Sequence, residues 1–182
     1  MSYQEYRSLV ARVFAEGKTT GPNQSEALTY YTDLNIRRMD KWDRRFALSE
    51  EASKALQTKN EPVRWLVLTE GWCGDAAHVV PILNHLANSS AHLELGLLLR
   101  DEHLDLMDEF LTNGGRSIPK LIRLNQDSEA TGSWGPRPQP AQQLMLTGKE
   151  NNKTKEEITN ELQIWYARDR GVTIANELLS LA

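Results

Sequence analysis

A short apolar run that leads into the chain's only cysteine constrains the fold more than any other feature of this sequence. Val63 to Thr69 is nearly all apolar and contains β-branched and aromatic residues, as expected of a strand covered on both faces. Cys73 follows this run and precedes a stretch, Gly74 to Ala87, in which apolar residues recur at helical spacing. A second apolar run, Leu93 to Leu99, predicts another buried strand. The order of strand, helix and strand predicts an α/β fold with a central parallel strand.

The remainder of the sequence predicts a hairpin and two sets of flanking helices. Helical spacing runs from His103 to Leu111, and Lys120 to Asn125 is expected to pair antiparallel with Glu129 to Trp134. Further helices are predicted at 141–146, after a capping box at Thr154 and Glu157, and around 174–179. Residues 1–60 are predicted to form a helical extension packed on the core, so that residues 61–182 make the main domain with a C-terminal helical tail.

The composition excludes several classes of partner. The formal net charge of -4 argues against a nucleic-acid partner, because proteins that bind nucleic acid usually carry a basic surplus. No stretch approaches the roughly 18 apolar residues that a membrane span needs, and the amino terminus lacks the pattern of a secretion signal. A cytoplasmic location without a membrane partner is therefore expected. With one cysteine, any disulfide must join this chain to another molecule.

Two motifs in this order resemble the thioredoxin superfamily. The first is Thr69-Glu70-Gly71-Trp72-Cys73-Gly74-Asp75-Ala76-Ala77, and the second is Asn113-Gly114-Gly115-Arg116-Ser117-Ile118-Pro119-Lys120. The likeness covers roughly Val63 to Gly148, and the chain is similar in particular to bacterial thioredoxin-family proteins with a long helical N-terminus. It implies a thioredoxin-like α/β fold, in which a central mixed sheet is flanked by helices, with a helical N-terminal extension and a C-terminal helix.

The resemblance also implies a site. Cys73 would be the catalytic nucleophile. The Ile118–Pro119 peptide bond would be cis, which places the proline ring against the cysteine and leaves the Ser117-Ile118 backbone free to pair with an extended substrate. The residues expected to bind substrate are Trp72, Gly74, Asp75, Ala76, Arg116, Ser117, Ile118 and Pro119, and no metal or other cofactor is expected.

Two positions depart from the pattern of a dithiol thioredoxin. Ala76 stands where a second cysteine would close a disulfide and release the substrate. Val67 stands where thioredoxins commonly hold a buried acid that relays protons, and neither Glu70 nor Asp75 occupies that strand position. A mixed disulfide on Cys73 would therefore need an external partner, either a low-molecular-weight thiol or a protein thiol, to complete a cycle.

Cys73 is expected to be an activated thiol. A sulfur at the first turn of a helix faces unpaired backbone N–H groups, so its pKa should fall below about 8.5. Asp75 would oppose this shift, whereas Arg116, expected beside the proline loop, would assist it. The sequence thus favours a monothiol redox protein. Two alternatives stay open: a binding module that holds a peptide or protein on its Trp72 and Ile118–Pro119 surface, and a protein similar to monothiol glutaredoxins, in which two copies of Cys73 with glutathione hold an iron–sulfur cluster.

Three other groups of residues are predicted to have structural roles. His78, His85 and His92 are seven residues apart, too widely spaced to chelate one ion easily, and are interpreted as solvated or core histidines. The basic residues around Trp42 are interpreted as a solvated helix face, and they are Arg37, Arg38, Lys41, Arg44 and Arg45. The segment from Trp134 to Pro138 is predicted to be a rigid turn, with a ligand-facing Arg137 as the alternative.

Overall fold

The sheet at the centre of the molecule is mixed. The computed structural model describes residues 1–182. β1 (Val63–Thr69) pairs in parallel with β2 (Leu93–Leu99) and antiparallel with β3 (Lys120–Leu124), which pairs antiparallel with β4 (Ala130–Trp134). The strand order is therefore β2-β1-β3-β4. β1 occupies an inner position, and the side chains of Trp65, Val67 and Leu68 are fully buried, as the apolar sequence of this strand predicts.

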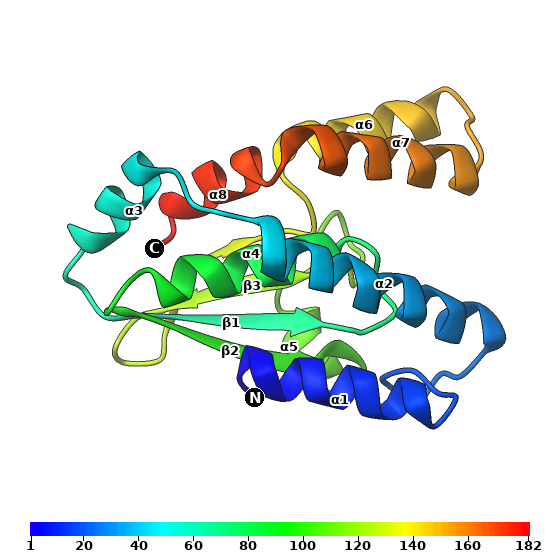
Figure 1. The fold of residues 1–182 in the computed structure, drawn as a ribbon, viewed down its shortest axis with the longest axis horizontal. Helices are drawn as coiled ribbons and strands as arrows, with labels where there is room; N and C mark the ends of the chain where they lie inside the picture. The colour runs from blue at the N-terminus through cyan, green and yellow to red at the C-terminus, as the bar shows by residue number, and fades with distance from the viewer.

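One helix, α4 (Ala76–Asn88), connects β1 to β2 and forms the middle of the hydrophobic core. Ten of its 13 residues are buried. One side of α4 faces the sheet, and its other sides contact α2 and α8 (Figure 1). α4 begins two residues later than the predicted start at Gly74, because Gly74 and Asp75 lie in the turn that leads out of β1. The residues just before α4 are therefore held between the sheet and a well-packed helix.

Three helices precede the sheet, namely α1 (Tyr3–Ala15), α2 (Glu26–Arg45) and α3 (Glu50–Gln57). α1 lies beside the edge strand β2, where the N-terminal nitrogen of Met1 donates a 2.9 Å hydrogen bond to the carbonyl oxygen of Leu97. α2 runs along α4 (Figure 1). These helices cover the sheet edge and the core, while the boundary between an extension and a main domain at residue 60 stays a prediction.

The segment between β2 and β3 is less helical than the sequence predicts. Instead of one helix from His103 to Leu111, it forms a short 3-10 turn, η1 (Arg100–Glu102), and a five-residue helix, α5 (Leu104–Asp108). Met107 is buried and Phe110 packs against the core, but Leu104 and Leu111, which share the predicted helical spacing, are exposed. The loop after α5 has positive φ angles at Asn113 (50°) and Gly114 (74°).

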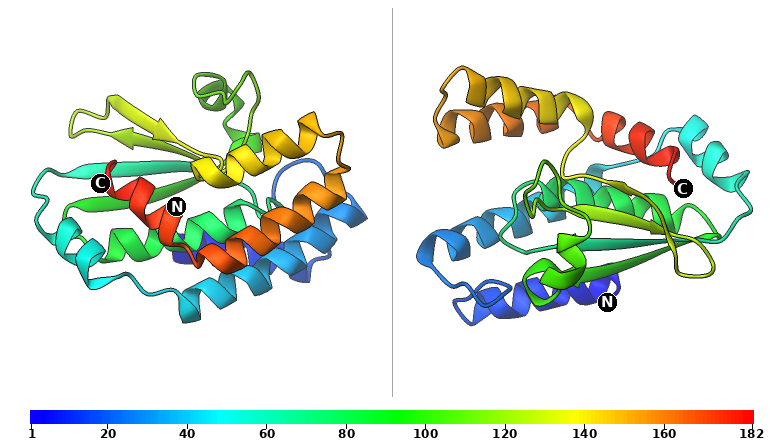
Figure 2. Two further views of the ribbon diagram at one scale, coloured as in Figure 1. Left: turned by 90° about the horizontal axis from the view of Figure 1, so that it is seen from above. Right: turned by 180° about the vertical axis from the view of Figure 1, so that it is seen from behind.

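The C-terminal helices are α6 (Gln139–Glu150), α7 (Lys155–Asp169) and α8 (Val172–Leu179). α6 is longer than predicted at both ends, and the capping box at Thr154 and Glu157 is confirmed at the start of α7. α6 and α7 lie side by side (Figure 2). None of the helices in the structure combines the length and apolar character that crossing a membrane requires.

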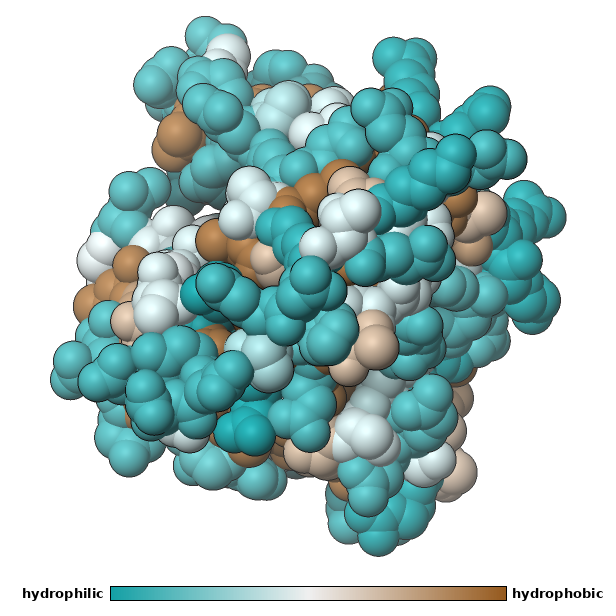
Figure 3. Space-filling view, turned by 90° about the vertical axis from the view of Figure 1, so that its left-hand side faces the viewer, coloured by the Kyte–Doolittle hydropathy of each residue, from teal (hydrophilic) through white to brown (hydrophobic).

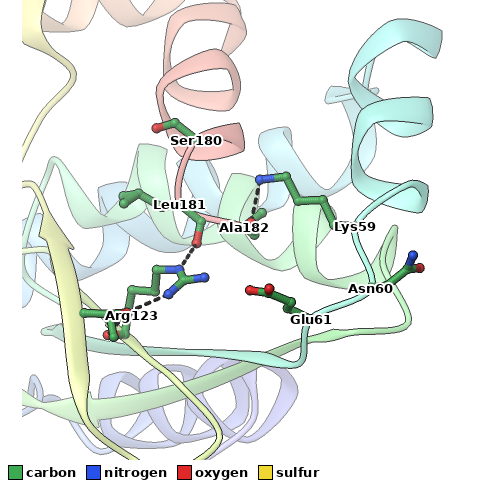
Figure 4. Close-up of a pocket in the computed structure, with 8 residues that line it drawn as sticks. Lys59, Asn60, Glu61, Arg123, Ser180, Leu181 and Ala182 are labelled. Carbon is green, nitrogen blue, oxygen red and sulfur yellow. Dashed lines mark hydrogen bonds between the residues drawn. The ribbon is translucent and has the colours of Figure 1, made fainter.

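The C-terminal residues dock at the end of the sheet opposite to Cys73. Lys59 Nζ donates to the carbonyl oxygen of Ala182 at 2.6 Å, and Arg123 Nε donates to that of Leu181 at 3.0 Å. These contacts line a cavity of about 620 Å³ (Figure 4). Figure 3 looks onto this end of the molecule, which is mainly hydrophilic with small, separate apolar patches. The polar groups here bind the chain's own carbonyl oxygens.

Candidate functional site

Cys73 lies in the turn between β1 and α4, one turn before the helix. Its backbone N–H donates to the carbonyl oxygen of Glu70 at 3.1 Å, and its carbonyl oxygen accepts from the N–H of Ala77 at 3.2 Å. The backbone N–H groups of Asp75 and Ala76 both face the sulfur and lower the pKa of the thiol. The sulfur therefore has the helix-end environment that the sequence predicts.

The sulfur is also in contact with the loop that precedes β3. Cys73 Sγ donates to the carbonyl oxygen of Ile118 at 3.2 Å, and the Ile118–Pro119 peptide bond is cis. Ile118 and Pro119 are buried, and Ser117 is partly exposed. Gly135 stacks closely behind this proline, since a Cβ there would lie 2.3 Å from the Pro119 carbonyl oxygen, and its φ of 114° also excludes other residues. The two motifs of the sequence thus meet at the sulfur.

Burial has the largest effect on the pKa of the Cys73 thiol and reverses the direction that the sequence predicts. The residue is 8% exposed. Burial raises the pKa of the Cys73 thiol to about 12, and the charge of Asp75 adds to that rise. The backbone N–H groups at the helix start and the charge of Arg137 lower the pKa, but by less. The expectation of a pKa below about 8.5 is therefore wrong, because it took the helix end into account without the loss of solvent.

The cation nearest to the site is Arg137, and Arg116 lies elsewhere. Arg116 is exposed and binds Asp108 through two contacts of 2.6 Å each. Arg137 comes from the turn after β4, and its Nη2 lies 2.6 Å from Asp75 Oδ2. The sequence raised Arg137 only as an alternative to a rigid turn. The turn between Gly135 and Pro138 aims the Arg137 side chain at Asp75, just before α4, and a ligand-facing role for Arg137 stays a prediction.

Asp75 is the hub of a buried polar network that reaches α7. The hydroxyl of Tyr166 donates to Asp75 Oδ1 at 2.8 Å, so both carboxylate oxygens have partners. Burial raises the pKa of Asp75, and Arg137 and Tyr166 counteract that rise. Asp75 takes the N-cap position of α4 without capping it, because its side chain is used in this network.

His78 extends the network as a core histidine. Its ring stacks on Tyr166 at 4.1 Å, its Nδ1 accepts from the indole of Trp42 at 2.9 Å, and its Nε2 contacts Gln163 at 2.9 Å. Burial lowers the pKa of His78 to about 3, so the ring is neutral at physiological pH. Trp42 is itself buried, so it packs α2 against α4.

A second carboxyl near Cys73, that of Glu70, was not assigned a role from the sequence. Glu70 is fully buried at the end of β1. It accepts hydrogen bonds from the hydroxyl of Thr20 and from the backbone N–H of Asp101, the latter at 2.9 Å. Burial raises the pKa of Glu70. No acid within β1 replaces the one that thioredoxins commonly hold at the position of Val67. A buried carboxyl, that of Glu70, does lie just beyond the end of this strand.

The remaining predicted substrate-binding residues differ in their exposure and in their contacts. Trp72 is partly exposed, the guanidinium of Arg100 lies 5.1 Å from its ring centre, and its buried indole N–H has no partner. Ala76 is buried in the first turn of α4, at the position where a dithiol thioredoxin would have its second cysteine. Gly74 is partly exposed and faces α2, where Arg38 Nη1 lies 3.7 Å from the position of a Cβ on Gly74.

Comparison with known proteins agrees with this arrangement. Residues 21–161 match the family model described as thioredoxin, so the chain belongs to the thioredoxin family. The fold is accordingly thioredoxin-like, with a mixed sheet flanked by helices. The matched segment includes Cys73, Pro119 and Arg137, and it begins in the loop between α1 and α2.

Two solved structures are similar over the whole chain. One is a protein of unknown function from Pseudomonas aeruginosa, with 18% sequence identity and a TM-score of 0.61 over 100% of this chain and 96% of that one. The other is an HIV epitope-scaffold, with 18% identity and a TM-score of 0.59 over 100% and 97% of the two chains. No curated protein matches the sequence. At this identity the likeness shows the fold alone.

Proposed function

We propose that this chain is a monothiol thioredoxin-like redox protein of the bacterial cytoplasm, which acts through Cys73 by exchange with an external thiol. The observation that carries the proposal is the contact of Cys73 Sγ with the carbonyl oxygen of Ile118, at 3.2 Å, next to the cis proline Pro119. This contact puts the sulfur beside the backbone to which an extended substrate could pair. The partner in this reaction is a low-molecular-weight thiol or a protein thiol or disulfide.

The reaction needs one sulfur from this chain and one from outside. The Cys73 thiol loses its proton to solvent and attacks a disulfide, so that a Cys73 mixed disulfide forms and one thiolate leaves. An external thiol then attacks the mixed disulfide, which restores Cys73 and yields a new disulfide. Ala76 cannot supply the second sulfur. The chain is therefore neither oxidised nor reduced over a full cycle.

The raised pKa of Cys73 sets a condition on this reaction. Few molecules carry a thiolate at neutral pH when the pKa lies near 12. The substrate must therefore contact Cys73 in a way that favours the thiolate. Displacement of the Sγ hydrogen bond to the Ile118 carbonyl oxygen would leave the sulfur facing the N–H groups of Asp75 and Ala76, which favour the charged form.

The test is adduct formation on the intact protein. Incubation with oxidised glutathione should add one glutathione to Cys73, as measured by intact mass, and reduced glutathione should remove it. Cys73→Ser should give no adduct and no thiol-transfer activity. An unmodified mass after prolonged incubation, or full transfer activity in Cys73→Ser, would contradict the proposal.

The burial of the sulfur favours a second candidate function, in which the chain binds a peptide or protein without turnover. A thiol that is 8% exposed with a pKa near 12 behaves as a small apolar side chain. The binding surface would then comprise Trp72, with its unpartnered indole N–H, and the Ile118–Pro119 loop. Under this alternative, affinity for the partner should survive Cys73→Ala and fall in Trp72→Ala. Loss of binding in Cys73→Ala would count against it.

A further inference from the structure

The N-terminal helices contribute a cation to the Cys73 site. Asn35 of α2 is fully buried, and its Nδ2 donates to the carbonyl oxygen of Gly71 at 2.9 Å. The Oδ1 of the same amide accepts from Arg38 Nη1 at 2.7 Å. One buried amide therefore ties α2 to the turn that holds Cys73 and also orients the guanidinium, which lies beside Gly74.

Arg38 has no acidic partner, in contrast to the other cation of the site. Arg137 is paired with Asp75 at 2.6 Å, whereas no carboxylate lies within 4.0 Å of the Arg38 guanidinium. Arg38 is partly buried, and the loss of solvent lowers the pKa of its guanidinium. Arg38 is therefore a partly buried cation beside the Cys73 turn, on which Asp75 acts only from beyond ion-pair distance, and its guanidinium has no direct carboxylate partner within the chain.

A small cavity adjoins this cation and is lined by residues of α2, α4 and α7. Its volume is about 140 Å³, and its lining includes Arg38, Lys41, His78 and Gln163. That space holds about four or five waters, enough for a carboxylate group. Lys41 is exposed and makes no ion pair, and His78 is neutral, so the charge around the cavity is positive.

From this placement we infer that Arg38, assisted by Lys41, binds a carboxylate of the molecule that exchanges with Cys73. The substrate class is then a carboxylate-bearing low-molecular-weight thiol or its disulfide. A guanidinium held by one hydrogen bond still offers donors in the planar geometry that suits a carboxylate. The inference rests on the proposed function, and it corrects the interpretation of the basic segment for Arg38, which is not part of a purely solvated face.

Two aromatic disulfides, one with carboxylates and one without, distinguish recognition of a carboxylate by Arg38 from the reactivity of the Cys73 thiol. Dithiobis(nitrobenzoate) carries a carboxylate on each ring, and dithiodipyridine carries none. With either reagent, Cys73 loses a proton and forms a mixed disulfide as the reagent's S–S bond breaks and one aromatic thiolate leaves. The rate is measured by absorbance of that thiolate, and the adduct by intact mass.

Arg38→Met should slow the reaction with dithiobis(nitrobenzoate) about tenfold, as expected for loss of one ion pair in a partly buried site. Its reaction with dithiodipyridine should stay within about twofold of the unmodified protein, because the thiol is unchanged. Arg37→Met is the matched control, since Arg37 is exposed and pairs with Asp33, and both of its rates should be unchanged. Arg38→Lys should retain part of the preference for the carboxylate reagent.

A competition experiment on the unmodified protein tests the same assignment even if Arg38→Met does not fold. Succinate should slow the reaction of the unmodified protein with dithiobis(nitrobenzoate) while leaving dithiodipyridine unaffected, and the neutral analogue succinamide should affect neither. Equal effects of succinate on both reagents, or equal slowing of both in Arg38→Met, would overturn the carboxylate assignment alone. If neither reagent gives a Cys73 adduct on the unmodified protein, the proposed function fails as well.

Discussion

Two carboxyls lie on either side of Cys73 in the chain, the fully buried Glu70 and the partly buried Asp75, and they are stabilised in different ways. Asp75 is bound by a cation, Arg137, and by the hydroxyl of Tyr166. Glu70 receives only neutral donors, the hydroxyl of Thr20 and the N–H of Asp101. A buried carboxylate needs a countercharge more than it needs hydrogen bonds, so the two groups differ in the charge that they can hold.

This difference separates the roles of the two sides of the site. On the α7 side, the Asp75 charge acts directly on the sulfur and raises the pKa of Cys73. On the N-terminal side, Glu70 joins the loop at Thr20 to the end of β1, since Thr20 Oγ1 also accepts from the N–H of Gly71 at 2.8 Å. Asp75 therefore changes the pKa of the Cys73 thiol, whereas Glu70 holds the loop at Thr20 against the end of β1.

Removal of the countercharge should have the largest effect. Arg137→Met leaves Asp75 buried and unpaired, which should reduce the free energy of unfolding by about 3–5 kcal/mol. Urea unfolding at neutral pH measures the change. Arg116→Met is the control, because that exposed arginine pairs only with Asp108 on the surface, and its unfolding midpoint should match that of the unmodified protein. Equal midpoints for both variants would mean that Asp75 is not held as a charge.

Loss of the neutral donor on the other side should cost less. Thr20→Val keeps the shape of the side chain but removes the hydroxyl from both Glu70 and the N–H of Gly71, at an expected cost of about 1–3 kcal/mol. Thr29→Val in α2 is the matched control and should change stability far less, because the hydroxyl of this partly exposed residue donates only to the Ser25 carbonyl oxygen of its own helix. If Thr20→Val destabilised the chain more than Arg137→Met, the ranking of the two sides would be reversed.

The pH dependence of stability should show that the Glu70 carboxyl favours its protonated form in the folded protein. Its folded-state pKa lies above the ordinary value of 4.5, so folding favours the protonated form. The contribution of protonated Glu70 to the free energy of unfolding is fully present below pH 4.5 and is lost as the pH rises through the raised pKa of this carboxyl. Relative to Glu70→Gln, the unmodified protein should lose about 1.4 kcal/mol for each unit of that shift. Urea unfolding over a pH series checks this, and a constant difference between the two proteins would contradict it.

How much of this molecule could be predicted depends on how far apart the interacting residues lie in the sequence. The strands from Val63 and Leu93 and the cap at Thr154 follow from local patterns, and the structure confirms them. The predicted helix after His103 is shorter than expected for a non-local reason, since only part of its apolar face, at Met107 and Phe110, meets the core while Leu104 and Leu111 are exposed. Local pattern is thus reliable only where the packing partner exists.

The site shows the same division. The motifs around Cys73 and Pro119 located the sulfur, but not the groups that surround it. Thr20 and Glu70 are 50 residues apart, and Tyr166 and Asp75 are 91 apart, so no spacing in the sequence links them. The predicted direction of the Cys73 pKa shift was wrong for this reason, because burial by residues distant in the sequence outweighs the effect of the helix start.

The smallest predicted effect tests directly whether one carboxyl, and not the other, controls the sulfur. Asp75→Asn removes a charge that raises the pKa of Cys73, so this pKa should fall from about 12 and alkylation at a fixed pH below it should accelerate, about tenfold for each unit of the fall. Glu70→Gln should leave alkylation unchanged, because Glu70 is held by neutral donors on the opposite side. The rate of iodoacetamide labelling, followed by mass spectrometry over a pH series, distinguishes the two variants. Acceleration in both would show that the sulfur responds to buried charge in general, whereas acceleration in neither would show that burial alone sets its pKa.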